Sequence, residues 1–229
     1  MTQHGALSDP TDLMVLGKGI VMVAPNDKHG RAINFWDRSR MTKDLAPRDT
    51  LVRIIYFTLF NSILFNESAQ KRGIVVIENL KGFNIDKCMD RHLSKALAKM
   101  LNEILPVKLK AMHVLQSTSW CNVYDIIMPS IKFLMGKDIR QRMLVHACNE
   151  SIVERALQPY GIQLGCIPEQ VGGTFKLSDS MAMLQKNQRE LIRRGVEGPR
   201  LHNGNVDEGD GRTVEDGGAA GVLLVARGA

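Results

Sequence analysis

The sequence predicts an α/β protein with a mainly parallel β-sheet flanked by helices. Short β-branched and apolar runs alternate along the chain with longer amphipathic segments, and glycine, proline or polar turns separate them. A crossover of about a dozen residues or more connects parallel strands, whereas antiparallel neighbours need only a short turn. The repeated strand-then-helix order therefore indicates one sheet built mostly from crossovers.

The first third of this pattern is a strand pair and a long helix. Residues 19–25 and 31–37 are apolar runs on either side of a polar turn, so we expect two strands joined by a short loop. A helix is expected over residues 49–70, with Asp49 or Thr50 as its N-cap. Its apolar stretch is interrupted by an arginine and an asparagine and is short for a membrane span.

The middle of the chain contributes two more strands around a helix. Residues 73–79 are β-branched and bounded by glycines, which favours a buried strand. Residues 90–105 place leucines and a methionine at helical spacing along one stripe. A strand is expected again over residues 109–118.

The last third adds a helix, a strand, two further helices and a tail. A helix is expected over residues 121–135, a strand over 142–148 and a helix over 149–161. Helix 178–195 begins at Ser178 or Asp179 and ends in two arginines, which suits the helix dipole. The expected organisation is an N-terminal extension (1–18), one domain (19–176), a C-terminal helix (177–196) and a disordered Gly-rich acidic tail (197–229).

Charge and cysteine content narrow the function classes. The chain of 229 residues carries a formal charge of +6, but residues 197–229 hold six acids and three bases, so the folded part is the basic part. The four cysteines form no C-x-x-C pair and no Cys/His cluster with metal spacing. We therefore expect free or buried thiols in a reducing compartment and no metal site.

Several functional signals are missing from the sequence. Residues 16–19 precede a strand and lack the spacing of a phosphate-binding loop, and there is no nucleophile elbow. His113 and His146 lie on expected strands, where packed core histidines are commoner than catalytic ones. Basic residues without aromatic interleaving argue against nucleic acid. Without a secretory signal, we expect a cytoplasmic protein. Without a nucleophile or metal constellation, we expect that it is not an enzyme, and we expect a monomer.

Residues 166–175 raise a question of their own, because an apolar run is followed by Pro168, Glu169 and the pair Gly172 and Gly173. Proline ends regular ladders, and glycine opens backbone angles and close approaches that other residues do not allow. We expect a bend at which two segments come close together, with a structural role for both glycines.

Five segments of this sequence, read in order, carry a resemblance, namely DKHGRAINFWD, GIVVIENLKGF, ILPVKLKAMHVL, IKFLMGKDIRQRMLVHA and IPEQVGG. Together they are similar to the CRAL-TRIO family of lipid-binding domains, and most closely to its tocopherol-transfer and retinaldehyde-binding branch. The chain departs from the family in having only 18 residues before the first strand. These are too few for the family's N-terminal helical lobe, so we expect a fragment or a minimal form.

The resemblance implies an apolar pocket closed by a mobile gate helix. Residues 121–135 match the gate, and Pro129 favours a kink within it. An ordinary amphipathic core helix is the alternative. The apolar stripe on the gate comprises Val123, Ile126, Ile127, Ile131 and Leu134.

Pocket-lining positions of the family fall on aliphatic residues of this chain, although each of them alone is more typical of simple core. The implied walls are Ile74, Val76, Leu97, Met100, Leu101, Leu105, Met112 and Val114. Glu78 follows Ile74 and Val76 on the same strand face, and a lone buried carboxylate is costly. It either meets a polar group of a ligand or lies at the sheet edge in water, and we favour the edge.

The resemblance also implies a cationic surface that contacts anionic lipid, with phosphoinositides as candidates. The matching positions are Lys108, Lys110, Lys137, Arg140 and Arg142. A solvated basic face is the plain alternative.

The leading hypothesis is a cytoplasmic, peripherally membrane-associated carrier that binds a single hydrophobic lipid, needs no cofactor and exchanges the lipid at anionic membranes. The alternative is a membrane or protein recruitment module whose pocket is filled by its own side chains. An enzyme ranks third. The residues do not identify the lipid.

Overall fold

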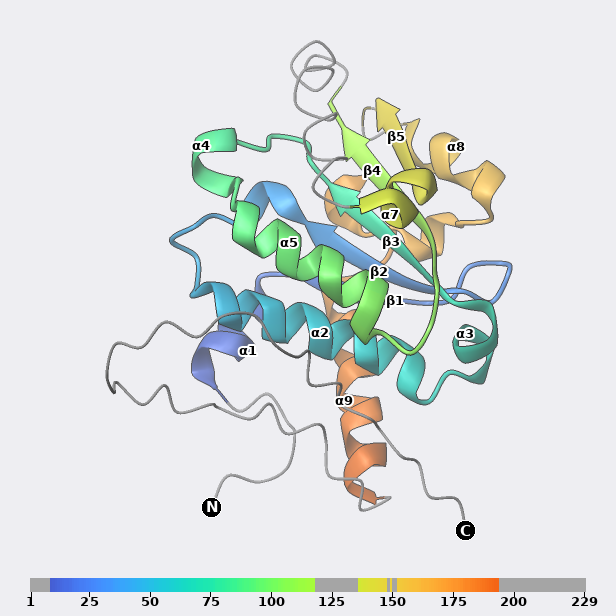
Figure 1. Cartoon of the computed structure of the whole chain (residues 1–229). Helices are drawn as coiled ribbons and strands as arrows, with labels where there is room; N and C mark the ends of the chain where they lie inside the picture. Colours follow the sequence, from blue (N-terminus) through green and yellow to red (C-terminus); the bar gives the residue numbers. More distant parts are fainter. Residues whose placement is uncertain (1–8, 118–135, 148, 150–151, 194–229) are drawn as a thin grey trace. The chain divides into compact units, whose positions relative to one another are not determined.

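The protein is described here by a computed structural model, which covers residues 9–117, 136–147, 149 and 152–193. Its centre is a five-stranded sheet in the order β1-β2-β3-β4-β5 (Figure 1). The first two strands pair antiparallel, and every later neighbour pairs parallel, which confirms the expected mainly parallel α/β fold. The strands are β1 (Val21–Ala24), β2 (Ala32–Asp37), β3 (Ile74–Asn79), β4 (Leu109–Gln116) and β5 (Met143–Ala147).

Most helices cover one face of the sheet, where α2 and α5 lie across the strands in Figure 1. The elements that bury side chains on this face are α1 (Pro10–Gly17), α2 (Arg48–Leu64), α3 (Glu67–Arg72), α4 (Ile85–Cys88), α5 (Arg91–Lys99), α7 (Gly136–Arg142) and α9 (Leu177–Arg193). A short 3-10 helix, Arg38–Arg40, follows β2, and a π-helical turn, Met100–Ile104, continues α5.

The opposite face is covered by the segment that follows β5. It contains α8 (Val153–Leu157) and three 3-10 turns, Gln158–Tyr160, Leu164–Cys166 and Glu169–Val171. Alternation along β3 supplies both faces: Ile74 and Val76 join the core under the helices, whereas Val75 and Ile77 join the core under α8. Burial on both faces explains why residues 74–77 of this strand are all aliphatic.

Three helices begin or end where the sequence did not predict. Helix α1 lies in the expected extension and buries Val15 and Leu16. The expected helix 49–70 is divided at Asn66, whose side chain accepts a hydrogen bond from the Ala69 amide and so caps α3. Helix α2 starts after Pro47 without a side-chain cap, and Thr50 is buried in its first turn.

The strand expected over residues 142–148 is shorter, because α7 extends to Arg142 before β5 begins. Strand β4 ends at Gln116. The expected gate helix and the expected C-terminal tail lie outside the described residues. Among the described residues, no helix combines the length and the apolar character that a bilayer span requires.

The two strand histidines contact each other on the α8 face. His113 Nδ1 lies 2.9 Å from His146 Nε2, and the ring of Tyr160 packs edge-on against both. Burial, with a smaller contribution from His146 and Arg31, lowers the pKa of His113 to about 3. Burial also lowers the pKa of His146. Two neutral imidazoles, one of which donates its N–H to the bare ring nitrogen of the other, fit the expected packed role.

The Pro168 segment forms the expected bend. Phe175 pairs with Pro168, and the Phe175 amide donates to the Ile167 carbonyl at 2.9 Å. Gly172 has a φ of 98°, which disfavours any residue with a Cβ. A Cβ on Gly173 would lie 1.8 Å from the Ile167 carbonyl oxygen, so this position requires glycine for close approach.

Gly173→Ala is expected to lower the free energy of unfolding by about 1–3 kcal/mol, because the backbone at Ile167 must move to admit the methyl group. Denaturant unfolding measures the change. Gly165→Ala is the matched control, since a Cβ there meets no atom within 4 Å. Equal losses in the two variants would contradict the close-approach explanation.

Candidate functional site

The predicted wall residues come together between the sheet and α5. Ile74 and Val76 on β3 and Met112 and Val114 on β4 share the helix-covered face through their register, in which Val76 is opposite Met112. Across from them stand residues of α5 and the π-helical turn. The fully buried members on that side are Leu97, Met100 and Leu101, and Leu105 packs against them while half-buried.

All wall residues except Leu105 are at most 5% exposed. The predicted gate residues Val123, Ile126, Ile127, Ile131 and Leu134 lie outside the described residues. The pocket between walls and gate therefore stays a prediction.

Two open clefts elsewhere on the molecule involve none of these walls. One, of about 750 Å³, lies between the start of α1, the loop before α2 and the start of α5. Arg48 and Asp90 line it, and Arg48 Nε lies 2.9 Å from Asp90 Oδ2. The other, of about 550 Å³, lies between Phe65 and α9. Most residues that line the two clefts are polar or charged.

The expectation for Glu78 was wrong. Its side chain is buried and does not lie at a solvent-exposed sheet edge. Arg38, at the end of β2, supplies the opposite charge, with its Nε 3.2 Å from Glu78 Oε1. Opposite charge is what makes a buried carboxylate tolerable. Burial nevertheless raises the pKa of Glu78, and Arg38 only partly offsets that effect.

Contacts of the Arg38 guanidinium are long for a buried charge. Nη2 donates to Ser94 Oγ at 3.4 Å, and Nη1 approaches Met41 Sδ at 3.7 Å. Nearby strand ends add polar atoms that have no hydrogen-bond partner in the described part of the chain, namely Trp36 Nε1 and Gln116 Oε1. Trp36 is opposite Glu78 in the register, and Gln116 follows Val114 on the same face.

The carboxyl ends of β2, β3 and β4 thus form a polar end to an otherwise aliphatic wall. Sequence reasoning missed Arg38, Trp36 and Gln116. Strand alternation from Val114 could have found Gln116, whereas the Arg38 contact depends on the turn after β2.

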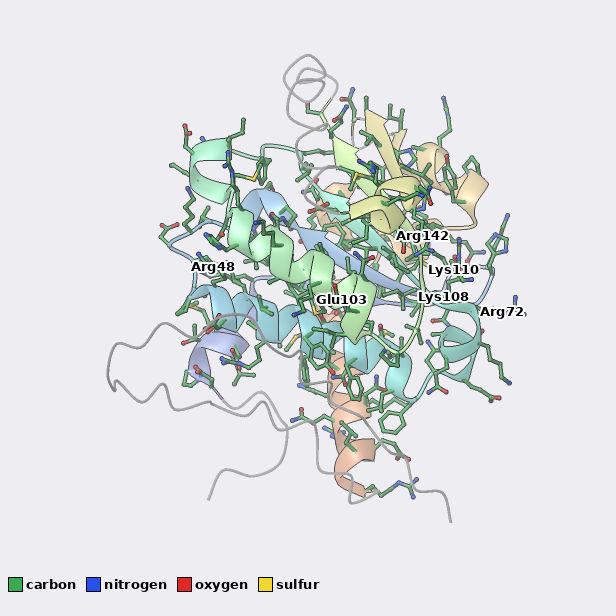
Figure 2. All side chains as sticks on the ribbon, in the orientation of Figure 1. Arg48, Arg72, Glu103, Lys108, Lys110 and Arg142 are labelled. Atoms are coloured by element: carbon green, nitrogen blue, oxygen red, sulfur yellow. The ribbon has the colours of Figure 1, made fainter. Side chains whose placement is uncertain are left out.

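At the opposite end of the strands, the predicted cationic residues gather. Figure 2 shows Lys108, Lys110 and Arg142 at the amino ends of β4 and β5, with Arg72 beside them. A shift of register leaves Lys110 without a β3 partner, so its side chain is exposed between the inward residues Leu109 and Ala111.

Helix α7 supplies the remaining cations. Lys137 and Arg140 are exposed and Arg142 is half-buried, while Ile139 anchors the helix in the core. Arg72 was not predicted. It precedes Gly73, against which the stem of Lys110 packs, with Lys110 Cγ 2.9 Å from a Cβ built at Gly73. The exposed acids Glu103 and Asp138 lie on the π-helical turn and on α7.

No group of three or more His, Cys, Asp or Glu side chains within the described ranges could hold a metal ion. Cys88 and Cys166 are buried free thiols.

The family model for the CRAL/TRIO domain matches residues 16–173, which is more than half of the chain. Among solved structures, the crystal structure of Sfh5 aligns with a TM-score of 0.48 and 15% sequence identity. The alignment covers 77% of this chain and 65% of the Sfh5 chain, so this chain spans less than two thirds of that protein. The predicted family resemblance is confirmed by the family model.

Arg38→Met is expected to lower the free energy of unfolding by about 3–5 kcal/mol, because it leaves Glu78 buried without a counter-charge. The double variant Arg38→Met, Glu78→Leu should recover most of that loss. Denaturant unfolding checks both.

The matched control is Arg48→Met, which breaks the exposed pair with Asp90 and should cost less than about 1 kcal/mol. A double variant as unstable as the single one would contradict the interpretation of Arg38 as the counter-charge of Glu78.

Proposed function

The chain belongs to the CRAL/TRIO domain family, a family of lipid-binding and transfer modules, and from that premise we propose that it binds one hydrophobic lipid and exchanges it at anionic membranes without catalysing a reaction. The single observation that carries the proposal beyond family membership is the convergence of the eight predicted wall residues in one core cluster between the sheet and α5. The protein acts in the cytoplasm as a monomer that associates peripherally with membranes.

The ligand lies between the sheet and α5, and the segment 121–135 acts as its gate. Each buried ligand methylene contributes about 0.8 kcal/mol, so an 18-carbon chain is held by on the order of 10 kcal/mol. Release into water is therefore slow. Release into the equally apolar interior of a bilayer does not lose this burial free energy. Exchange consequently takes place where the protein contacts a membrane.

The cationic residues at the amino ends of the strands provide that contact. A basic residue close to an anionic leaflet contributes about 1 kcal/mol. Arg72, Lys108, Lys110 and Arg142 lie together there (Figure 2), and Lys137 and Arg140 extend the surface along α7. Phosphoinositides suit it, because each headgroup carries several negative charges.

A second candidate is a recruitment module with a filled pocket, and the near-complete burial of the walls favours it. Protein atoms alone bury Ile74, Val76, Met112 and Val114 completely, as expected when a pocket is filled by the protein's own side chains. In this alternative the cationic surface recruits the protein to membranes, and no lipid leaves with it.

The full chain, purified from an expression host, is expected to carry one lipid that native mass spectrometry detects as a single mass increment and that solvent extraction identifies. Ile127→Asp should lose uptake from liposomes, because a carboxylate on the gate stripe opposes closure over an apolar ligand. The filled-pocket alternative gains support if no lipid is bound, or if Ile127→Asp takes up lipid as well as the wild type does.

Removing two cations with Lys108→Ala and Lys110→Ala is expected to weaken adsorption to phosphatidylserine vesicles about 30-fold, corresponding to about 2 kcal/mol. Vesicle sedimentation measures the partition coefficient. The control is Lys95→Ala with Lys99→Ala, which removes the same charge from exposed positions on α5. If both double variants weaken adsorption equally, adsorption depends on the total charge and not on the strand-end surface.

A further inference from the structure

The segment between the π-helical turn and β4 presents two different rows of side chains. Ile104, Pro106, Lys108 and Lys110 are exposed, and the residues between them point inward. Leu105 and Val107 pack against the helix-covered core, and Leu109 is fully buried. The outward row is therefore apolar at its first two positions and basic at its last two.

Ile104 is the most exposed large apolar side chain in the described ranges, at 51%. A single exposed aliphatic residue needs no explanation. Here, however, it begins a row that continues directly into the cationic surface, and a second exposed apolar residue, Pro106, stands between them. The apolar and basic positions thus form one continuous outward edge.

This edge is held in place by its backbone and by its inward neighbours. The Leu105 amide donates to the Met100 carbonyl at 3.1 Å and closes the π-helical turn, and Pro106 restricts its own backbone. Lys110 is positioned by the register shift in β4 and by packing of its stem on Gly73. Binding through this edge would cost little ordering entropy.

Helix α7 lies next to the turn, since Asn102 Nδ2 is 3.8 Å from a Cβ built at Gly136, and its exposed Lys137 and Arg140 add positive charge there. The two acids Glu103 and Asp138 partly offset this positive charge. Glu103, labelled in Figure 2 at the end of α5, immediately precedes Ile104.

We propose that the edge Ile104–Lys110 is a membrane anchor, in which Ile104 and Pro106 enter the apolar boundary of an anionic bilayer while Lys108 and Lys110 remain at the headgroups. Apolar side chains combined with adjacent lysines are the composition that favours this boundary, where lysine stems lie along apolar surface and keep their charge in water. The inference rests on the proposed exchange at membranes and specifies which side of the protein faces them.

The first test measures adsorption of the full chain to vesicles of phosphatidylcholine with phosphatidylserine. Ile104→Ser is expected to weaken partition about tenfold, which corresponds to about 1.4 kcal/mol. Leu13→Ser is the matched control, because Leu13 is 50% exposed on α1, outside the edge, and it should leave partition unchanged. Glu103→Gln should strengthen partition about fivefold. Equal partition for Ile104→Ser and the wild type overturns the proposal.

A second test locates the side chain directly. Ile104→Trp should show a blue-shifted emission with these vesicles and quenching by brominated acyl chains, above the background of the native tryptophans, whereas Leu13→Trp should show neither. Emission from Ile104→Trp that stays unchanged while the protein adsorbs would place this edge away from the bilayer and overturn the proposal.

Lipid content by native mass spectrometry, measured on the same samples, separates this inference from the proposed function. Ile104→Ser should retain its bound lipid, because Ile104 lies outside the predicted walls. A wild type that carries lipid but adsorbs without dependence on Ile104 overturns the anchor alone. Adsorption that depends on Ile104 in a protein without lipid supports the anchor and overturns the carrier.

Discussion

Two-sided burial of the central strands is the constraint on which the rest of the structure depends. β3 and β4 place aliphatic side chains on both faces, so each face needs a cover. Crossover helices supply the first cover, and the second comes from α8 and the bend at Pro168. Gly173 allows the two arms of that bend to approach each other closely at Ile167. In the proposed carrier, the sheet offers its helix-covered face to the ligand, because the other face is already covered.

The helix-covered face is divided along the strands into regions of different chemistry. Aliphatic side chains occupy its centre, and the pair Arg38 and Glu78, with Trp36 and Gln116, occupies the carboxyl ends. A buried ion pair with long contacts contributes little to stability, although removing one partner is costly. The position of this ion pair at the end of an apolar wall suits a ligand that has one polar end.

Cations and exposed apolar residues meet at the amino ends of the same strands. Lys108, Lys110 and Arg142 lie there because the strands begin together, and Arg72 joins them through the close approach at Gly73. The π-helical turn sets Ile104 outward at this same end. One side of the molecule thus combines positive charge with apolar surface, which is the combination that a lipid surface attracts.

Local periodicity by itself determined the α/β class, the strand centres and the burial of Ile74 and Val76, because alternation and helical spacing are properties of neighbouring residues. The family followed from the five similar segments taken in order. Only tertiary contacts decided that α1 joins the core, that Arg38 pairs with Glu78 and that Arg72 lies beside Lys110. Each of those outcomes depends on residues far apart in the chain. The surroundings of a strand end also depend on long-range packing. Because Arg38 is 40 residues from Glu78 in the chain, the sequence favoured a solvent-exposed Glu78, whereas the structure buries it.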